Sequence, residues 1–217
     1  FALSFLKNQP NMKALSFSIF LFAFLFALTA QGQKYWGSIT GEGPVVKEEL
    51  SLDEFQSVGL GISGTIYLTP GKTQKVIVEG QKNLIDNLKQ EVKNGSWNIA
   101  DMKFYITLPT VKTLAIGGSG KIISKEAFNG LSTLKLSIGG SGNIEFAGTA
   151  DSVEISIGGS GSVKAGELKV QTSKVSIGGS GNCYIEVGER LDVSIGGSGS
   201  VHYKGRPRIN SSIAGSG

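Results

Sequence analysis

The first residues of this chain to consider for chemistry are those of a five-residue unit, Ile-Gly-Gly-Ser-Gly, which occurs five times. A variant of the unit, Ile213-Ala214-Gly215-Ser216-Gly217, ends the chain. A glycine-rich loop followed by lysine can cradle a phosphate, and the stretch from Gly117 to Lys121 resembles the end of such a loop. However, Ile122 stands where Ser or Thr would hold magnesium, and the sister copies lack the lysine. The unit is therefore not a nucleotide-binding loop.

Calcium-binding glycine-rich repeats need an Asp after Gly-x-Gly. At the nearest position the copies in this chain carry other residues: Lys121, Asn143, Ser162, Asn182 and Ser200. A metal site or a catalytic triad on His202 would need partners, and this is the only histidine. We expect it to be a solvated surface residue.

The remaining nucleophiles are also poor candidates. Cys183 occupies a position equivalent to Ile144 and Val163, so we expect a buried thiol rather than a reactive one. The serines of the repeated unit lack the neighbouring base that would activate them. The sequence thus predicts no catalytic residue, no cofactor and no metal site.

The spacing of the units predicts the fold that positions them. Successive units start 22, 19, 20, 18 and 18 residues apart, as expected for the coils of a solenoid. Alternate residues between units are apolar or glycine, for example Leu134, Leu136, Ile138, Gly140, Gly142, Ile144 and Phe146, which indicates strands with one inward face. We predict an all-β, right-handed parallel β-helix with about 20 residues per coil.

The outward positions give the candidate binding face. When coils stack, serines form two rows: Ser119, Ser141, Ser160, Ser180 and Ser198 in one, and Ser137, Ser156, Ser176 and Ser194 in the other. A strip of hydroxyls and exposed backbone would let a sugar or another backbone approach closely. The alternative is structural: the serines bond to one another and glycine keeps the corner tight.

The chain before the repeats divides into further segments. Met12-Lys13 and the apolar run that follows them predict a secretory signal peptide cut after Gly32, with a retained membrane anchor as the alternative. Only that segment would then meet a membrane. We predict that residues 1–11 lie upstream of the signal at 12–32, that a tail follows at 33–52, and that 53–217 form one domain. Within this domain we expect lead-in coils and a short helix, Asn83–Val92, in 53–110, and regular repeats in 111–217.

Composition limits the partners. Residues 33–217 carry 19 basic and 17 acidic side chains without a basic cluster, which argues against nucleic-acid binding. The single cysteine allows no disulfide within the chain. Because Gly217 ends the chain without a capping segment, we expect either that the chain is a fragment or that another domain or protomer covers this end, as in an end-to-end oligomer.

Three stretches carry a resemblance to a known family: VGLGISGTIYLTPG, NLIDNLKQEV and the recurring GGSG units. Over roughly residues 52–217 the chain resembles the auto-transporter adhesin head domain, or GIN domain, family. The resemblance implies a parallel β-helix exported through a Gram-negative envelope, and an adhesin-like role. Many relatives carry Asp after the Gly-Gly-Ser unit, whereas Gly follows here, which weakens the case for an acidic, cation-linked surface.

These observations favour a non-catalytic envelope or surface domain, located in the periplasm, on the outer membrane or outside the cell. It would bind a glycan or an envelope protein through a flat β-helix face. One alternative is a polysaccharide lyase or hydrolase, which would need clustered acids or Arg along a groove, whereas Glu145, Glu154 and Glu167 differ in position from coil to coil. Another is a structural or regulatory periplasmic protein without a glycan ligand.

Overall fold

The computed structural model describes residues 41–61, 63–91 and 102–217, although nothing is described for the side chains of 87–91. In these ranges the chain forms one helix and thirteen strands: β1 Val45–Leu50, β2 Ser57–Leu60, β3 Thr65–Pro70, β4 Lys75–Gln81, α2 Lys82–Glu91, β5 Lys103–Leu108, β6 Thr113–Ile116, β7 Lys121–Ser124, β8 Phe128–Ile138, β9 Asn143–Ile157, β10 Ser162–Ile177, β11 Asn182–Ile195, β12 Ser200–Lys204 and β13 Arg208–Ile213. The predicted segments 1–11 and 12–32, and residues 33–40 of the predicted tail, lie outside the described residues.

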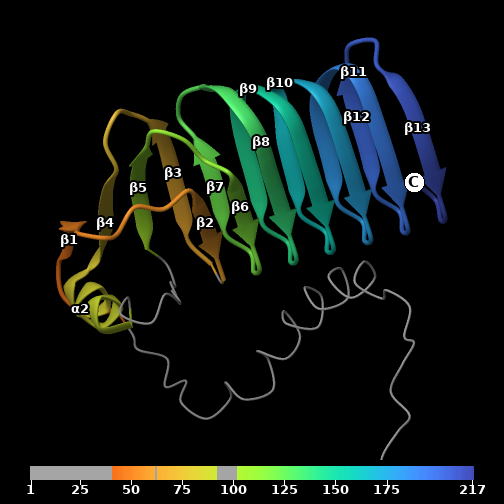
Figure 1. Cartoon of the computed structure of the whole chain (residues 1–217). Helices are drawn as coiled ribbons and strands as arrows, with labels where there is room; N and C mark the ends of the chain where they lie inside the picture. Colours follow the sequence, from red (N-terminus) through yellow and green to blue (C-terminus); the bar gives the residue numbers. More distant parts are fainter. Residues whose placement is uncertain (1–40, 62, 92–101) are drawn as a thin grey trace, which may run out of the picture. The chain divides into compact units, whose positions relative to one another are not determined.

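The strands build a parallel β-helix of about five turns with coils about 20 residues apart, as the sequence predicted (Figure 1). Each coil contributes one strand to each of two sheet faces. We call the first the serine face; it contains β2, β6, β8, the later halves of β9 to β11, and β13. The second, the tyrosine face, contains β3, β7, the earlier halves of β9 to β11, and β12.

Alternation along each strand produces the core. Most residues predicted to face inward are buried, including Leu136, Ile144 and Val163 at 0% exposure, whereas Gly140 is half-buried and Tyr203, which has the same parity, is exposed. Cys183 is also fully buried, as predicted. The isoleucine that opens each repeated unit pairs with its counterpart in the next coil, for example Ile157 with Ile177, so identical side chains pack in a row along the solenoid. Among the described residues, Ser173 is the one buried polar side chain of this otherwise apolar core, and burial of the apolar side chains stabilises the fold without a disulfide.

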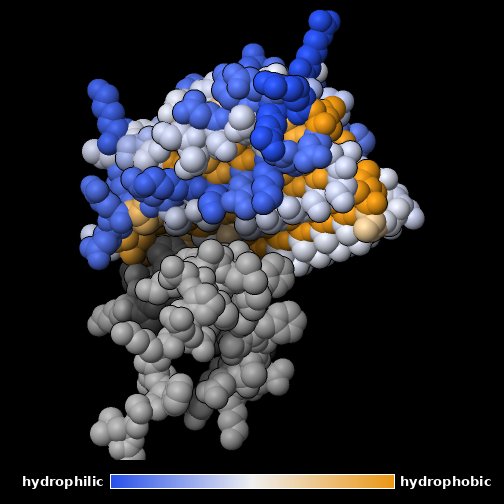
Figure 2. Space-filling model, turned by 45° about the vertical axis from the view of Figure 1, so that its right-hand side comes forward, coloured by the Kyte–Doolittle hydropathy of each residue, from blue (hydrophilic) through white to orange (hydrophobic). Residues whose placement is uncertain are grey.

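Inward residues are buried by the coil that stacks on them. Ile195 is 4% exposed, whereas its partner Ile213 in the last coil is 51% exposed. Ile209, also in the last coil, is 48% exposed. Figure 2, which brings these carboxyl-terminal coils forward, shows apolar atoms reaching the surface among hydrophilic ones. Each coil therefore contributes stability mainly through its neighbours, as is typical of solenoids.

The corner formed by the repeated unit depends on direct stacking of backbone on backbone. The amide of Ser160 donates to the carbonyl of Gly140 at 3.1 Å, and the amide of Ser162 donates to Gly142 at 3.1 Å. A Cβ added at Gly159, the second glycine of its unit, would overlap the carbonyl oxygen of Gly140. We expected the second glycine to face the core, and this was wrong: its missing side chain points at the neighbouring coil.

The amino-terminal end differs from the prediction of a tail at 33–52. Strand β1, which lies within that range, pairs antiparallel with β4, and β4 pairs antiparallel with β5. The three strands extend the tyrosine face beyond β3. The predicted helix is confirmed as α2, whose Ile85 is fully buried. These elements close the first coil, and the charged side chains of β1, among them Lys47 and Glu49, protect the sheet edge from further pairing.

The corner geometry gives a test of the stacking argument. Gly159→Ala should lower the free energy of unfolding by about 1–3 kcal/mol, because the new methyl group has no room against Gly140. Its neighbour Gly158 is the matched control, since a Cβ there would lie 3.8 Å from the carbonyl oxygen of Ile138, an ordinary contact. Gly158→Ala should change stability by no more than about 0.5 kcal/mol. Thermal unfolding followed by circular dichroism measures both, and equal losses would contradict the argument.

One buried polar group gives a second test. The Ser173 hydroxyl is 3% exposed, lies between Val153 and Leu191, and has no hydrogen-bond partner among the described residues. Ser173→Ala should therefore leave stability unchanged or raise it by up to about 1–2 kcal/mol. Ser176→Ala, which alters a hydroxyl on the outward side of the same strand, is the control. A lower melting temperature for Ser173→Ala would mean that the hydroxyl has a partner in solution.

Candidate binding face

The serines predicted to form a binding face lie on two neighbouring surfaces. Ser137, Ser156, Ser176 and Ser194 are in register on the outer side of the serine face. Ser119, Ser141, Ser160, Ser180 and Ser198 are exposed along the corner edge. Among the described residues, no hydrogen bond joins one of these serine side chains to another. Their hydroxyls are thus available to water or to a ligand.

Charged side chains flank the strand serines on the serine face and pair among themselves. Lys135 lies 3.1 Å from Glu154 in the next coil. Arg190 lies 2.9 Å from Asp192, and this guanidinium lowers the pKa of the Asp192 carboxyl. Lysine and acid alternate in this row, which continues from Glu154 through Lys174 to Asp192. The charges compensate one another, so this face presents no strong field to a charged partner.

The tyrosine face carries a row that the sequence did not predict. Seven outward side chains are cross-strand partners in succession: Tyr105, Tyr67, Ile123, Glu145, Lys164, Tyr184 and His202. The row therefore has an aromatic pair at each end, with Ile123 and a pair of opposite charges between them. Neighbours in such a row stand close enough for their side chains to touch.

The two aromatic pairs differ in what covers them. The rings of Tyr67 and Tyr105 stack with centroids 5.2 Å apart, and Lys125 and Lys47 lie 4.3 Å and 5.0 Å from those two rings. The other pair, Tyr184 and His202, stacks at 4.6 Å with the planes 10° apart. His202 is exposed, as predicted, but it is held flat against a tyrosine. No lysine stacks on Tyr184 in the described part of the chain.

Glu79 fixes the amino-terminal pair in place. Its carboxylate accepts hydrogen bonds from Lys103 at 3.1 Å and from the Tyr105 hydroxyl at 3.0 Å, and it lies 3.2 Å from Lys47 of β1. These three groups lower the pKa of Glu79 from 4.5 to about 2. Burial and the hydrogen bond to Glu79 raise the pKa of Tyr105. This cluster joins β1, β4 and β5 and holds Lys47 over the ring of Tyr105.

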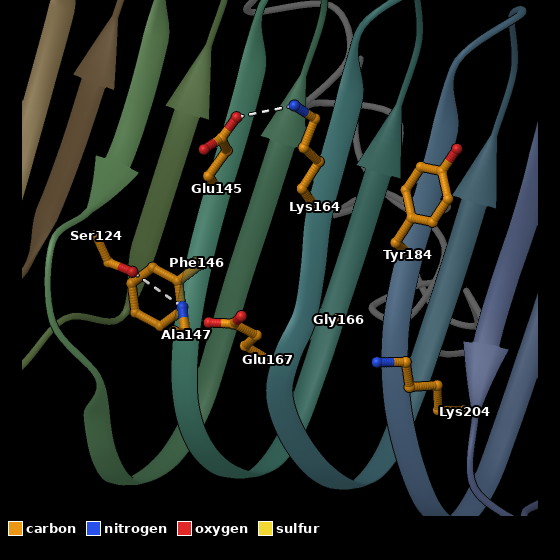
Figure 3. A pocket seen from close by; sticks show the side chains of 9 residues that line it. All are labelled: Ser124, Glu145, Phe146, Ala147, Lys164, Gly166, Glu167, Tyr184 and Lys204. Atoms are coloured by element: carbon orange, nitrogen blue, oxygen red, sulfur yellow. Dashed lines mark hydrogen bonds and ion pairs between the residues drawn. The ribbon is translucent and has the colours of Figure 1, made fainter.

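A shallow hollow of about 540 Å³ lies beside Tyr184 (Figure 3). Its lining comes from successive coils and comprises Ser124, Glu145, Phe146, Ala147, Lys164, Gly166, Glu167, Tyr184 and Lys204. Tyr184, which is 42% exposed, stands at its edge. The hollow is open to solvent and crosses several strands, so its shape suits an extended ligand better than a small enclosed one.

Unequal coil lengths create the hollow. Between matching partners, β10 has one more residue than β9, from Lys164 to Glu167 against Glu145 to Ala147. It also bulges against β11 between Ala165 and Lys169. The amide of Ala147 donates to the Ser124 hydroxyl at 2.9 Å and holds the adjacent bend. A β-bulge displaces its strand locally, and here it opens a space on the sheet surface.

An ion pair leaves one face of Tyr184 accessible. The Lys164 ammonium lies 2.9 Å from Glu145 and turns toward it (Figure 3). Lys164 is the row neighbour of Tyr184, so this pairing keeps its charge away from the ring. Two acids, Glu145 and Glu167, and two lysines, Lys164 and Lys204, line the hollow, which therefore has no net charge.

Cys183 lies in the core and away from this surface. Burial raises the pKa of the Cys183 thiol to about 12, so it stays protonated and unreactive. Within residues 41–61, 63–91 and 102–217, no three His, Cys, Asp or Glu side chains come together in a way that could hold a metal. In the same ranges no helix is long and apolar enough to cross a membrane.

The sequence of residues 54–207 matches the family described as "Putative auto-transporter adhesin, head GIN domain". The chain belongs to this family. Its β-helix is therefore a GIN domain, and the resemblance inferred from the repeated unit is confirmed. The family description indicates an adhesin-like protein that is exported or located at a surface.

Solved structures share the GIN-domain fold. A protein named as a putative adhesin from Bacteroides fragilis superposes with a TM-score of 0.62 at 23% identity, over 82% of this chain and 97% of its own. A protein named as a putative lipid binding protein from Parabacteroides distasonis gives a TM-score of 0.50 at 24% identity, over 82% and 97%. At these identities the likeness concerns the fold. No curated protein matches the chain significantly.

The Glu79 cluster predicts how stability depends on pH. Because the folded-state pKa of about 2 lies below the usual 4.5, the stabilisation is complete above about pH 4.5 and is lost as the pH falls toward 2. Glu79→Gln should lower the melting temperature at neutral pH and flatten its decline between about pH 5 and pH 2. Glu49→Gln, which removes only the exposed pair with Lys75, is the matched control. Identical pH profiles for the two variants would contradict the role of Glu79.

Proposed function

We propose that this protein is an exported, non-catalytic, adhesin-like protein that binds a glycan on its tyrosine face. The observation that carries the proposal is the open hollow beside Tyr184, whose ring is exposed and has no lysine stacked on it among the described residues. The apolar CH face of a sugar ring packs well on an aromatic side chain, while charged and hydroxyl groups around it bind the sugar oxygens. The hollow offers both kinds of contact.

The groups around the hollow support binding rather than turnover. Of the two acids that line the hollow, Glu145 is paired with Lys164 at 2.9 Å, which leaves Glu167 as the single unpaired carboxylate of the lining rather than the free pair that glycoside hydrolysis uses. His202 is stacked on Tyr184, and the Cys183 thiol is buried. Membership of a family described as adhesins agrees with this reading. Export is supported by the predicted signal segment at 12–32, and display at the cell envelope would bring the open face to its ligand.

The two serine rows remain the competing surface for a ligand. They offer hydroxyls without bulk, and their neighbouring charges compensate one another. They lack an exposed aromatic ring, which usually supplies a large share of the contact energy at a binding surface. We therefore place the glycan on the tyrosine face and treat the serines as the alternative that the experiment must separate.

A glycan array probed with the purified protein and then with Tyr184→Ala tests the proposal. Tyr184→Ala should weaken binding on the order of tenfold, and Tyr184→Phe should retain most of it, because the ring rather than the hydroxyl supplies the contact. Replacement of Ser137, Ser156, Ser176 and Ser194 by alanine should leave binding unchanged. Circular dichroism checks that each variant is folded.

The other outcomes each exclude a different reading. Loss of binding in the serine variant but not in Tyr184→Ala would move the site to the serine face. Release of shortened oligosaccharides from a bound glycan would make the protein an enzyme. Absence of binding to every glycan would overturn the proposal and favour a structural or regulatory role.

A further inference from the structure

A second row of outward side chains runs beside the tyrosine row on the same face. Its members follow the last glycine of each corner: Lys121, Asn143, Ser162, Asn182 and Ser200. We call it the amide row. The backbone N–H groups of Asn143 and Asn182 donate hydrogen bonds to glycine carbonyls of the preceding coil at 3.0 Å and 3.1 Å, so the backbone is fixed at both residues. Among the described residues, no partner binds their side-chain amides.

The amide row and the tyrosine row form one surface. Asn182 precedes Tyr184 by two residues, and Asn143 precedes Glu145 by two, so both members of each pair point to the same side of the sheet. On an extended strand they stand about 7 Å apart. A ring lying on Tyr184 would thus have the Asn182 amide within reach of its substituents. The same relation joins Ser162 to Lys164 in the coil between.

The chemistry of this surface favours an uncharged ligand. The hollow has two acids and two lysines, one of each joined as Glu145 and Lys164. In the amide row only Lys121, at the amino-terminal end, is charged, so the part of the surface beside Tyr184 offers neither the excess positive charge that would attract an acidic polymer nor the reverse. Side-chain amides and hydroxyls both donate and accept hydrogen bonds, which matches the hydroxyl groups of a neutral sugar.

The direction of both rows sets the direction of the ligand. Neighbouring members belong to adjacent coils, about 4.8 Å apart, so Asn143 and Asn182 are separated by about 10 Å. A linear chain lying along the solenoid axis meets a new polar side chain at every coil. A single sugar could reach only one or two of them.

We propose that the tyrosine face binds an uncharged, linear glycan that lies along the solenoid axis. One ring of the glycan packs on Tyr184, and the hydroxyl groups of this ring and its neighbours bond to Asn143, Ser162 and Asn182. This inference rests on the proposed function and adds the ligand class, its orientation and the amide row. Contact with several coils makes the affinity depend on the length of the glycan.

The test uses two panels of probes with the full protein. One contains neutral linear glucan, mannan, xylan and galactan oligosaccharides from the monosaccharide to the hexasaccharide, and the other contains oligogalacturonate, alginate and hyaluronan oligosaccharides. Calorimetry should find binding to a member of the neutral panel, with affinity that rises with length and changes little with salt. The double variant Asn143→Ala, Asn182→Ala should lose about tenfold or more in affinity.

Controls separate a lost contact from a lost fold. Asn210→Ala removes an asparagine from the serine face, where it faces Asp192, and should change affinity by less than about twofold. Asn182→Ser introduces the residue that Ser162 and Ser200 carry at this position in adjacent coils, so it should fold normally and weaken binding less than Asn182→Ala does.

The outcomes distinguish this inference from the proposed function. Salt-sensitive binding of acidic oligosaccharides alone would overturn the inference and leave glycan binding in place. Equal affinity for short and long neutral oligosaccharides, or unchanged affinity in the double asparagine variant, would also overturn it. Failure of both panels to bind, together with a negative glycan array, would overturn the proposed function itself.

Discussion

The structure depends on the stacking of one glycine corner directly on the next. From Gly140 onward, the second glycine of each unit lies so close to a carbonyl oxygen of the preceding coil that no side chain fits between them; a Cβ at Gly179, for example, would overlap the carbonyl oxygen of Gly159. This contact, with the amide hydrogen bonds beside it, sets the distance and register between coils. The isoleucines can form a continuous row only because the corners repeat identically. Ala214 in the last unit occupies the first position, where the spacing leaves room for a methyl group in the four preceding units, at Gly139, Gly158, Gly178 and Gly196.

A fixed corner forces variation in coil length to the opposite bend. The coil that starts at Ile157 has 20 residues and the next has 18, yet their corners remain in register. The surplus is absorbed as the bulge between Ala165 and Lys169, which opens the hollow beside Tyr184. A solenoid can thus carry a distinct surface hollow without disturbing its core, because the bend tolerates insertions that the corner does not.

Period and parity made most of the fold predictable. Strand alternation around Leu134 and Ile144, the helix at α2 and the buried Cys183 all follow from local pattern. The antiparallel pairing of β1 with β4 was missed because it joins strands about 30 residues apart that share no repeat. The tyrosine row was missed for a related reason: Tyr67 and Tyr184 align only through the registers of the intervening coils. The 20 and 18 residue spacings were the available signal, since unequal coils must bulge.

The tyrosine rings on this face differ in how far they are covered, because their charged neighbours differ. Tyr67 and Tyr105 have the same chemistry as Tyr184, but Lys125 and Lys47 lie over their rings. Lys164 could occupy the same place over Tyr184, and its long stem allows it. Instead, its ammonium lies 2.9 Å from the carboxylate of Glu145 in the preceding coil, on the side away from Tyr184. An exposed ion pair of this kind contributes little to stability, so its main consequence on this face is that one side of the Tyr184 ring is left uncovered.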